Sequence, residues 1–182
     1  MSERLYIGID LGTYQSTIAS SSGTIHTVET VVGRPKDPVA RNMLKRDVLF
    51  GAEALKHKMS CDLYRPMAKG VTQDDEANLA AAKAFMGHLI ETMDPEEYDE
   101  VVGVVCSPSH VSFTDKSNLV ATLRGQVNAI MVVSEPFATA YGIGEFHGTI
   151  VVDIGAGTTD IARLYGTFPN DDDQISIAEA GD

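Results

Sequence analysis

Apolar and polar positions near the start of the chain predict three β-strands in a meander. The segment RLYIGID (4–10) is typical of a strand that runs into a glycine turn, and QSTIASS (15–21) predicts a second strand. After a turn at Gly23, the alternation of TIHTVETVV (24–32) predicts a third. We therefore expect the first 32 residues to form one β-meander.

The clearest helical pattern is DDEANLAAAKAFMGHLIETM (74–93), whose apolar side chains recur every three or four residues. Its first three residues are acidic, and the dipole of a helix favours negative charge at that end. The expected apolar face consists of Leu79, Ala82, Met86, Leu89, Ile90 and Met93. We expect its methionines to belong to the core rather than to a metal or cofactor site.

Two continuous apolar runs, EVVGVVC (100–106) and AIMVVS (129–134), predict strands that are buried on both faces. Residues 33–70 are mixed and contain three prolines, so we interpret them as a small inserted subdomain. Within them, DVLFG (47–51) predicts a short strand and AEALKHK (52–58) a short helix.

Two further helices are predicted on either side of the second apolar run. One covers 113–125, with Ser112 or Thr114 as its N-cap, and the other covers 136–144, with Pro136 at its first position. The predicted order is thus β-β-β, insertion, α-β-α-β-α.

A second meander is predicted from TIVVDIG (149–155), TTDIARLY (158–165) and QISIAEA (174–180). Like the first, it opens with an aspartate and a glycine-rich turn. The chain therefore begins to repeat its own architecture near residue 148.

Charge narrows the classes of partner. With 26 acidic and 14 basic residues, the net charge is −12, which disfavours binding to nucleic acid or to an anionic membrane surface. No apolar run approaches the roughly 20 residues that a membrane helix needs, so we expect no membrane insertion. Cys61 and Cys106 match no metal-binding spacing, and we expect two reduced, mostly buried thiols of a cytoplasmic protein.

The turns in IDLGTYQS (9–16) and VDIGAGTTD (152–160) share one plan: a strand, an aspartate, a glycine-rich turn with hydroxyl residues, and a strand. Glycine lets the backbone approach a ligand closely, and the N–H groups of such turns can hold phosphate oxygens. One such turn alone is as consistent with a structural hairpin as with a binding site. Two copies in the same context predict a pair of phosphate-binding turns.

Side chains in the turns fit the same chemistry. Thr13, Thr158 and Thr159 add hydroxyl donors. The aspartates at the strand ends, Asp10 and Asp153, suit Mg²⁺, which keeps several waters and takes few direct protein ligands. We therefore expect these two carboxylates to act on the metal through bound water.

These motifs resemble a known superfamily. GIDLGT and VVDIGAGTTDI are similar to the phosphate-1 and phosphate-2 motifs of the actin, sugar-kinase and Hsp70 superfamily. RPMAKGV (65–71) and SEPFATAYG (134–142) resemble segments of bacterial actins of the MreB type, and VVGRPKD and VVSEPF resemble the MamK type, the filament proteins of magnetosome-forming bacteria. The resemblance covers essentially the whole chain.

The resemblance implies an α/β fold: an actin-like ATPase domain, ribonuclease H-like, of order β-β-β-α-β-α-β-α, followed by the first three strands of a second such domain. Residues 1–146 are then domain I, with 33–70 as its inserted subdomain, and 147–182 are the incomplete start of domain II. The two domains of such proteins close on ATP and Mg²⁺.

The resemblance also assigns roles to residues. Asp10, Gly12, Thr13 and Tyr14 correspond to phosphate-1, and Asp153, Gly155, Gly157, Thr158 and Thr159 to phosphate-2. Asp10 and Asp153 correspond to the metal site. Glu135 corresponds to the acid that positions the attacking water, with Asp153 as the second catalytic residue.

Three alternatives stay open for single residues. Glu135 is also consistent with an acid that caps the helix beside Pro136. Asp160 fits an outer-sphere partner of the metal or a cap at a strand end. Tyr14 replaces a smaller residue of many relatives, and its ring either crowds the phosphates or faces solvent.

The adenosine motif of these relatives lies in later sequence, so the resemblance implies an N-terminal part or a truncated paralogue. It also implies that the second meander exposes an apolar face. Three functions follow as hypotheses. The first is a cytoplasmic, cytoskeletal filament subunit that binds and hydrolyses ATP and organises magnetosomes or another structure. The second is a non-enzymatic regulator of a full-length actin-like partner, and the third is an Hsp70-like ATPase.

Overall fold

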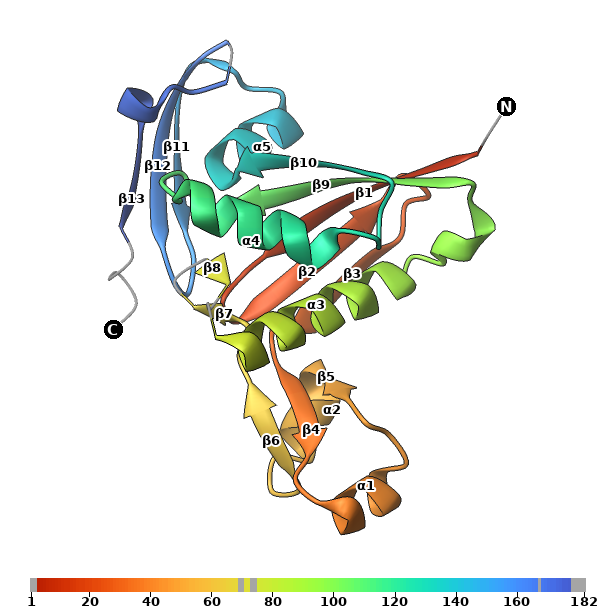
Figure 1. Ribbon diagram of the computed structural model, residues 1–182. Helices are drawn as coiled ribbons and strands as arrows, with labels where there is room; N and C mark the ends of the chain where they lie inside the picture. Colours follow the sequence, from red (N-terminus) through yellow and green to blue (C-terminus); the bar gives the residue numbers. More distant parts are fainter. Residues whose placement is uncertain (1–2, 69–70, 73–74, 167, 178–182) are drawn as a thin grey trace.

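The computed structural model describes residues 3–68, 71–72, 75–166 and 168–177, and a mixed five-stranded sheet lies at its centre (Figure 1). In spatial order β10-β9-β1-β2-β3, its strands are β1 (Arg4–Leu11), β2 (Gln15–Ser20), β3 (Ile25–Glu29), β9 (Glu100–Ser107) and β10 (Ala129–Ser134). The first three strands form an antiparallel meander, as predicted, while β9 and β10 run parallel to β1. The carboxyl ends of β1, β9 and β10 therefore meet at one edge of the sheet.

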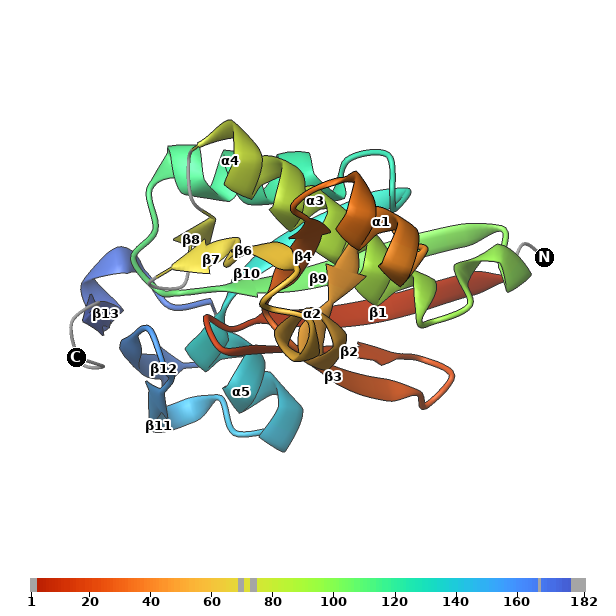
Figure 2. The same cartoon turned by 90° about the horizontal axis from the view of Figure 1, so that it is seen from below.

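Helices cover both faces of this sheet. α3 (Glu76–Glu91) and α4 (Phe113–Leu123) pack side by side on one face, and α5 (Glu135–Ile143) lies on the opposite face (Figures 1 and 2). The cap of α3 is Asp75, whose side chain accepts a hydrogen bond from the N–H of Asn78 at 3.0 Å. Of the two caps predicted for α4, the structure has Ser112, which accepts from the N–H of Asp115.

The main core lies between α3 and the sheet. Phe85 and Leu89 of α3 are both at most 1% exposed and belong to the same buried cluster as Ile7 and Ile9 of β1. The apolar face predicted for this helix is confirmed, except that Leu79 is only half-buried. The methionines of that face, Met86 and Met93, are core residues, as expected.

A second antiparallel sheet is built from β11 (His147–Ile154), β12 (Thr159–Tyr165) and β13 (Gln174–Ile177), with a short 3₁₀ turn, η2 (Asp171–Asp173), before its last strand. One face packs on α5 through Val151 and Leu164, which contact Ala140. The other face carries five apolar side chains that are 44–76% exposed: Ile150, Val152, Ile154, Ile175 and Ile177. The predicted exposed apolar face is thus confirmed.

A small three-stranded sheet with two helices projects from one side of the main body (Figure 1). Its elements are β4 (Val32–Pro35), α1 (Pro38–Leu44), β5 (Leu49–Phe50), α2 (Gly51–Lys56) and β6 (Cys61–Tyr64). Its own core contains Val31, Leu49, Ala54 and Cys61. Helix α1 was not predicted, although the Asp-Pro pair before it is a start signal: the Asp37 carboxylate accepts from the N–H of Ala40 at 2.7 Å.

The remaining elements are short. β7 (Met67–Ala68) and β8 (Val71–Thr72) pair with each other, and η1 (Pro95–Glu97) precedes β9. In the described part of the chain, no helix combines the length and the apolarity that crossing a bilayer requires.

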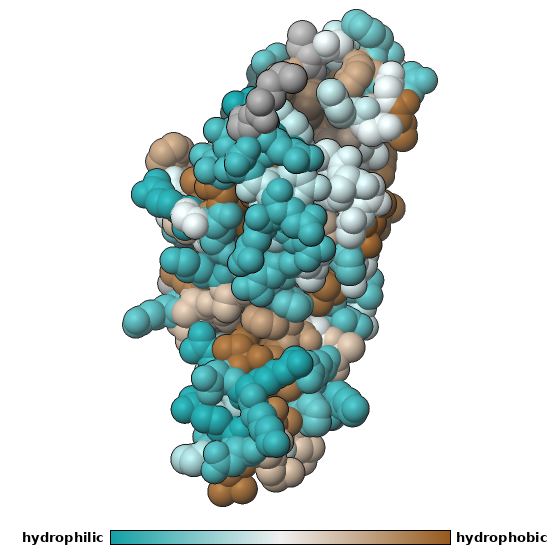
Figure 3. All heavy atoms as spheres, turned by 90° about the vertical axis from the view of Figure 1, so that its right-hand side faces the viewer, coloured by the Kyte–Doolittle hydropathy of each residue, from teal (hydrophilic) through white to brown (hydrophobic). Residues whose placement is uncertain are grey.

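The side of the molecule opposite the second sheet is mainly hydrophilic, with small apolar patches (Figure 3). Both cysteines are free; Cys61 is buried, and Cys106 is half-buried.

Two expectations about strands were wrong. Residues 129–134 form an edge strand whose one partner among the described strands is β9, so Met131 is 56% exposed and, within this strand, only Val133 is buried. β9 is fully buried on one face and half-buried on the other. The third strand ends at Glu29 rather than residue 32, because Val32 already pairs with Phe50 and Tyr64 in the small sheet.

Candidate functional site

The first glycine turn joins β1 to β2 and is held from beneath by Thr30. The Thr30 hydroxyl donates to the carbonyl oxygen of Gly12 at 2.7 Å, and the Thr30 N–H donates to the carbonyl oxygen of Tyr14 at 2.9 Å. Thr30 is fully buried, so these bonds are partly shielded from water on the Thr30 side. The turn therefore has a fixed position relative to the main sheet.

The close packing of this turn explains its glycine. A β-carbon at position 12 would collide with the backbone oxygen of Gln15, whereas one at Gly8, in the strand β1 that precedes the turn, would meet nothing within 4 Å. We expect Gly12→Ala to lower the free energy of unfolding by about 1–3 kcal/mol, the usual range for overpacking. Gly8→Ala, the matched control, should stay within about 0.5 kcal/mol of the parent in urea unfolding. Equal effects of the two substitutions would contradict the close packing of the turn.

The second turn joins β11 to β12. Asp153 lies directly opposite Asp160 across the two strands, and the N–H of Gly155 donates to the carbonyl oxygen of Thr158 at 2.9 Å, which closes the turn. Thr158 is buried and Asp153 is half-buried. The motif thus ends in a compact loop with one carboxylate at its base.

Glu135 reaches the same region from a third element. It is the first residue of α5 and follows directly after β10, whose last residue, Ser134, is paired with Ser107 at the end of β9. The strand ends place Glu135 at the sheet edge where β1 ends in Asp10 and Leu11. Its position in the first turn of α5 also fits the favourable placement of an acid at a helix N-terminus.

The structure brings nine predicted site residues to one cleft, which encloses about 550 Å³ of empty volume, part of it open to solvent. They are Asp10, Gly12, Thr13, Tyr14, Glu135, Asp153, Gly155, Gly157 and Thr158. Thr159 is not among the lining residues: it pairs with Ile154 and Ile177, whose side chains lie on the exposed apolar face. Tyr14 borders the cleft with a ring that is 57% exposed.

Gln15 and Ala156 also line the cleft, and the sequence reasoning missed them as site residues. Both lie within the two turn motifs, so the only available signal was their proximity to the glycines. Thr30 was missed as well, because it is remote from either motif and its role depends on a contact that forms only in the folded protein.

Negative charge accumulates in the cleft. Burial raises the pKa of Glu135 to about 8, with further contributions from the charges of Asp160, Asp10 and Asp153. Burial likewise raises the pKa of Asp10, helped by Asp153, and that of Asp153, helped by Asp160. Among the described residues that line the cleft there is no lysine or arginine. The arrangement therefore favours a bound cation, which would stabilise the three carboxylates in their charged form.

The thiol of Cys106 lies behind the same carboxylates. Burial raises its pKa to about 12, and the charges of Asp10, Glu135 and Asp153 add to the effect. A thiol with so high a pKa carries almost no thiolate at neutral pH, which makes it a poor nucleophile and metal ligand. We therefore assign no chemical role to Cys106.

Asp160 has a structural partner. It is 1% exposed, and one carboxylate oxygen accepts a hydrogen bond from the N–H of Ser109 at 2.6 Å. That bond connects the second sheet to the loop after β9. Asp160 thus accepts a hydrogen bond from the backbone, as a capping residue would. The negative charge of Asp160 also contributes to the raised pKa of Glu135.

The residues present fit Mg²⁺ held largely through water. Within the described residues, no three His, Cys, Asp or Glu side chains gather closely enough to ligate a metal directly. Two carboxylates facing an open cleft, with no basic side chain lining it, match an ion that retains most of its hydration shell. Asp10 and Asp153 are the residues that would hold it.

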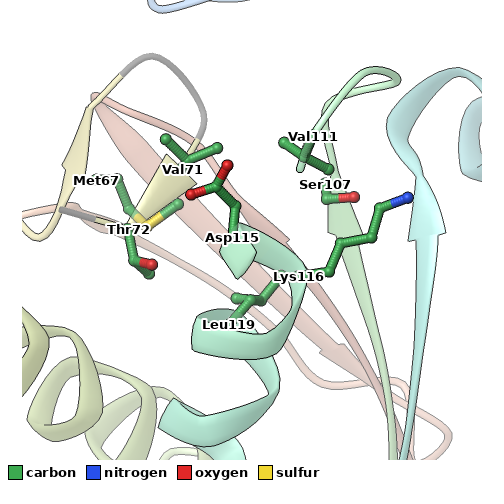
Figure 4. Close-up of a pocket in the computed structure, with 8 residues that line it drawn as sticks. All are labelled: Met67, Val71, Thr72, Ser107, Val111, Asp115, Lys116 and Leu119. Atoms are coloured by element: carbon green, nitrogen blue, oxygen red, sulfur yellow. The ribbon is translucent and has the colours of Figure 1, made fainter. Parts of the chain in front are cut away.

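A separate crevice lies between β8 and the start of α4, and its chemistry differs. Figure 4 shows that Met67, Val71 and Leu119 contribute much of its wall, while the Lys116 side chain extends toward Ser107. It encloses about 210 Å³ and none of the predicted site residues lines it. Thr72, Ser107, Asp115 and Lys116 also line it, and Asp115 is the single carboxylate among these described lining residues.

Comparisons with known proteins agree on one family. The family model described as MreB/Mbl protein matches residues 4–167. The actin-like protein MamK of Magnetospirillum gryphiswaldense is 36% identical over 98% of this chain and 50% of its own length. The chain thus spans about half the length of the curated relatives it matches.

Solved structures give the same result. A MamK double helical filament superimposes with a TM-score of 0.93 at 35% identity, covering 97% of this chain and 55% of that one. A non-polymerising MamK mutant bound to AMPPNP gives a TM-score of 0.85 at 34% identity, covering 99% and 56%. The actin-like α/β fold expected from the motifs is therefore confirmed.

Proposed function

This chain belongs to the MreB/Mbl family, and from that premise we propose that it is part of an actin-like filament subunit that binds and hydrolyses ATP with Mg²⁺. The observation that carries the proposal is the cleft in which Asp10, Glu135 and Asp153 converge beside two glycine turns. A similar protein, MamK, has been seen as a filament and, as a mutant, with the ATP analogue AMPPNP. The MreB/Mbl match favours this function over an Hsp70-like ATPase.

The two turns would hold the phosphates from opposite sides. Residues 1–146, as domain I, contribute the turn at Gly12 and Thr13, and residues 147–182, as the start of domain II, contribute the turn at Gly155–Thr158. Backbone N–H groups and threonine hydroxyls are the donors that such a clamp needs. The acidic chain would thus bind an anion through its backbone rather than through basic side chains.

The carboxylates would divide the remaining tasks. Asp10 and Asp153 would hold the hydrated Mg²⁺, which supplies positive charge to the β- and γ-phosphates when bound. A nearby cation also lowers the pKa of Glu135 and so favours its charged form. Charged Glu135 would then orient a water for in-line attack on the γ-phosphate.

The likeness to MamK extends the proposal to assembly. Self-association into cytoplasmic filaments, which organise magnetosomes or another cellular structure, is the function that follows from that likeness. The alternative is a non-enzymatic regulator that binds the filament of a full-length actin-like partner.

The test compares this chain with a longer protein that contains it and the second half found in relatives. We expect the longer protein to hydrolyse ATP and to pellet as filaments only with Mg²⁺ and ATP. A longer protein that binds ATP but never pellets would contradict the filament proposal. If the 182-residue chain shows no affinity for ATP in calorimetry yet co-sediments with a relative's filaments, the regulator is favoured instead.

A further inference from the structure

We propose that Thr30 is a positioning residue that orients the first phosphate turn for nucleotide binding, an inference that rests on the function proposed for the cleft. Thr30 does not line the cleft. It lies between β3 and β4, where the chain leaves the main sheet for the small sheet. Its contacts nevertheless fix the turn that lies over it.

The direction of each hydrogen bond can be assigned. The Gly12 carbonyl oxygen can only accept, so the single hydroxyl proton of Thr30 goes to it, at 2.7 Å. The Ser16 hydroxyl, 2.8 Å from Thr30 Oγ1, must then be the donor in that pair. Ser16 and Thr30 are both fully buried, so a buried chain runs from Ser16 through Thr30 to the turn.

This chain of bonds sets the direction of a peptide unit. The C=O of Gly12 and the N–H of Thr13 belong to one planar trans peptide and therefore point in opposite directions. With the carbonyl held toward Thr30, the N–H of Thr13 is directed away from Thr30. The main-chain bond from Thr30 to the Tyr14 carbonyl fixes the far end of the same turn.

Loss of the Thr30 hydroxyl would leave the buried Ser16 hydroxyl and the half-buried Gly12 carbonyl oxygen without this partner. Thr30→Val keeps the shape of the side chain and the main-chain bond to Tyr14, but it removes the donor to Gly12 and the acceptor for Ser16. A peptide released in this way can rotate, and even small displacements of a phosphate-binding donor weaken its hydrogen bond. Thr30→Ser retains the hydroxyl and should restore the parent behaviour.

The chain offers two matched controls. The first control is Thr27 of β3, whose hydroxyl lies 3.0 Å from that of Thr17 in β2. This pair is exposed and remote from the turn, so Thr27→Val tests the loss of a threonine hydroxyl as such. Ser16→Ala removes only the donor to Thr30 and leaves the bond from Thr30 to Gly12 intact. We expect its effect to lie between those of Thr27→Val and Thr30→Val.

The experiment measures the Mg²⁺–ATP affinity of the longer protein that contains this chain, by calorimetry and at a temperature where every variant is folded. We expect Thr30→Val to weaken binding about tenfold, with Thr30→Ser and Thr27→Val within about twofold of the parent chain. A Thr30→Val variant that is less stable but binds ATP as tightly as the parent would show a merely structural role and overturn the inference.

A second measurement keeps the inference independent of nucleotide binding. In the nucleotide-free chain, amide hydrogen exchange followed residue by residue should be about tenfold faster at Thr13–Gln15 in Thr30→Val than in Thr27→Val. If the longer protein does not bind ATP, the proposed function fails, while this exchange measurement still decides whether Thr30 orders the turn. Unchanged exchange at the turn would overturn the inference in either case.

Discussion

Replacing Glu135 by alanine is expected to lower ATP turnover by the longer protein by about 100-fold or more, the usual contribution of a residue that acts on the attacking nucleophile. The affinity for ATP should change much less, because Glu135 is proposed to act on a water rather than on the phosphates. Glu135→Gln should be similarly impaired, because it keeps the size of the side chain and removes its charge. Turnover and affinity are measured separately, by phosphate release and by calorimetry.

The same substitution at the other end of the helix is the control. Glu145 follows α5 and is exposed, and it does not line the cleft. Glu145→Ala should therefore leave turnover within about twofold of the parent. If Glu135→Ala kept full turnover, the carboxylate would be only a favourable acid at a helix start, the alternative that the sequence left open.

Replacing Asp153 by asparagine is expected to weaken the binding of Mg²⁺–ATP by about 10- to 100-fold, the range found when an outer-shell partner of a metal is lost. The reason is electrostatic: Asp153 and Asp10 are the carboxylates proposed to hold the hydrated ion, and an amide carries no charge to do so. ATP binding measured in excess EDTA should respond far less. The decisive quantity is the ratio of affinities with and without Mg²⁺, obtained by titration calorimetry.

Asp172 provides the comparison for this variant. It is an exposed aspartate of η2, between β12 and β13, and it does not line the cleft. Asp172→Asn removes the same charge from the same part of the chain and should leave the Mg²⁺ dependence unchanged. An equal loss of affinity with and without Mg²⁺ in Asp153→Asn would mean that Asp153 shapes the turn instead of holding the ion.

Much of the fold could be predicted from local patterns. The alternation in β1, the helical period of α3 and the glycine turns depend on residues a few positions apart, and the structure confirms these elements. The burial of β10 was predicted wrongly because the same apolar run suits a central or an edge strand. Its place at the edge is decided by which strands pair, and in the described part of the chain only β9 pairs with it.

The residues of the candidate site also fall into those that local sequence predicts and those that only the folded structure identifies. The two turn motifs identified eight of the residues that line the cleft, since glycines, threonines and aspartates at strand ends carry a local signal. Glu135 was identified through the resemblance of the segment 134–142. Thr30 carried no local signal, because its importance comes from a hydrogen bond to Gly12 that forms only in the folded protein. Thr159 was included through its motif, yet the register of β12 places it with residues of the exposed face.

The sequence by itself determined the two turns, the order of most strands and helices, and the resemblance that these motifs carry. Only the tertiary structure decided that Asp10, Glu135 and Asp153 face one cleft and that burial and neighbouring negative charges, including that of Asp160, raise their pKa values. The physical reason is the distance along the chain between the residues that interact. Turns and periodic elements are set by neighbours along the chain, whereas desolvation and the interaction of charges depend on segments that meet only after folding.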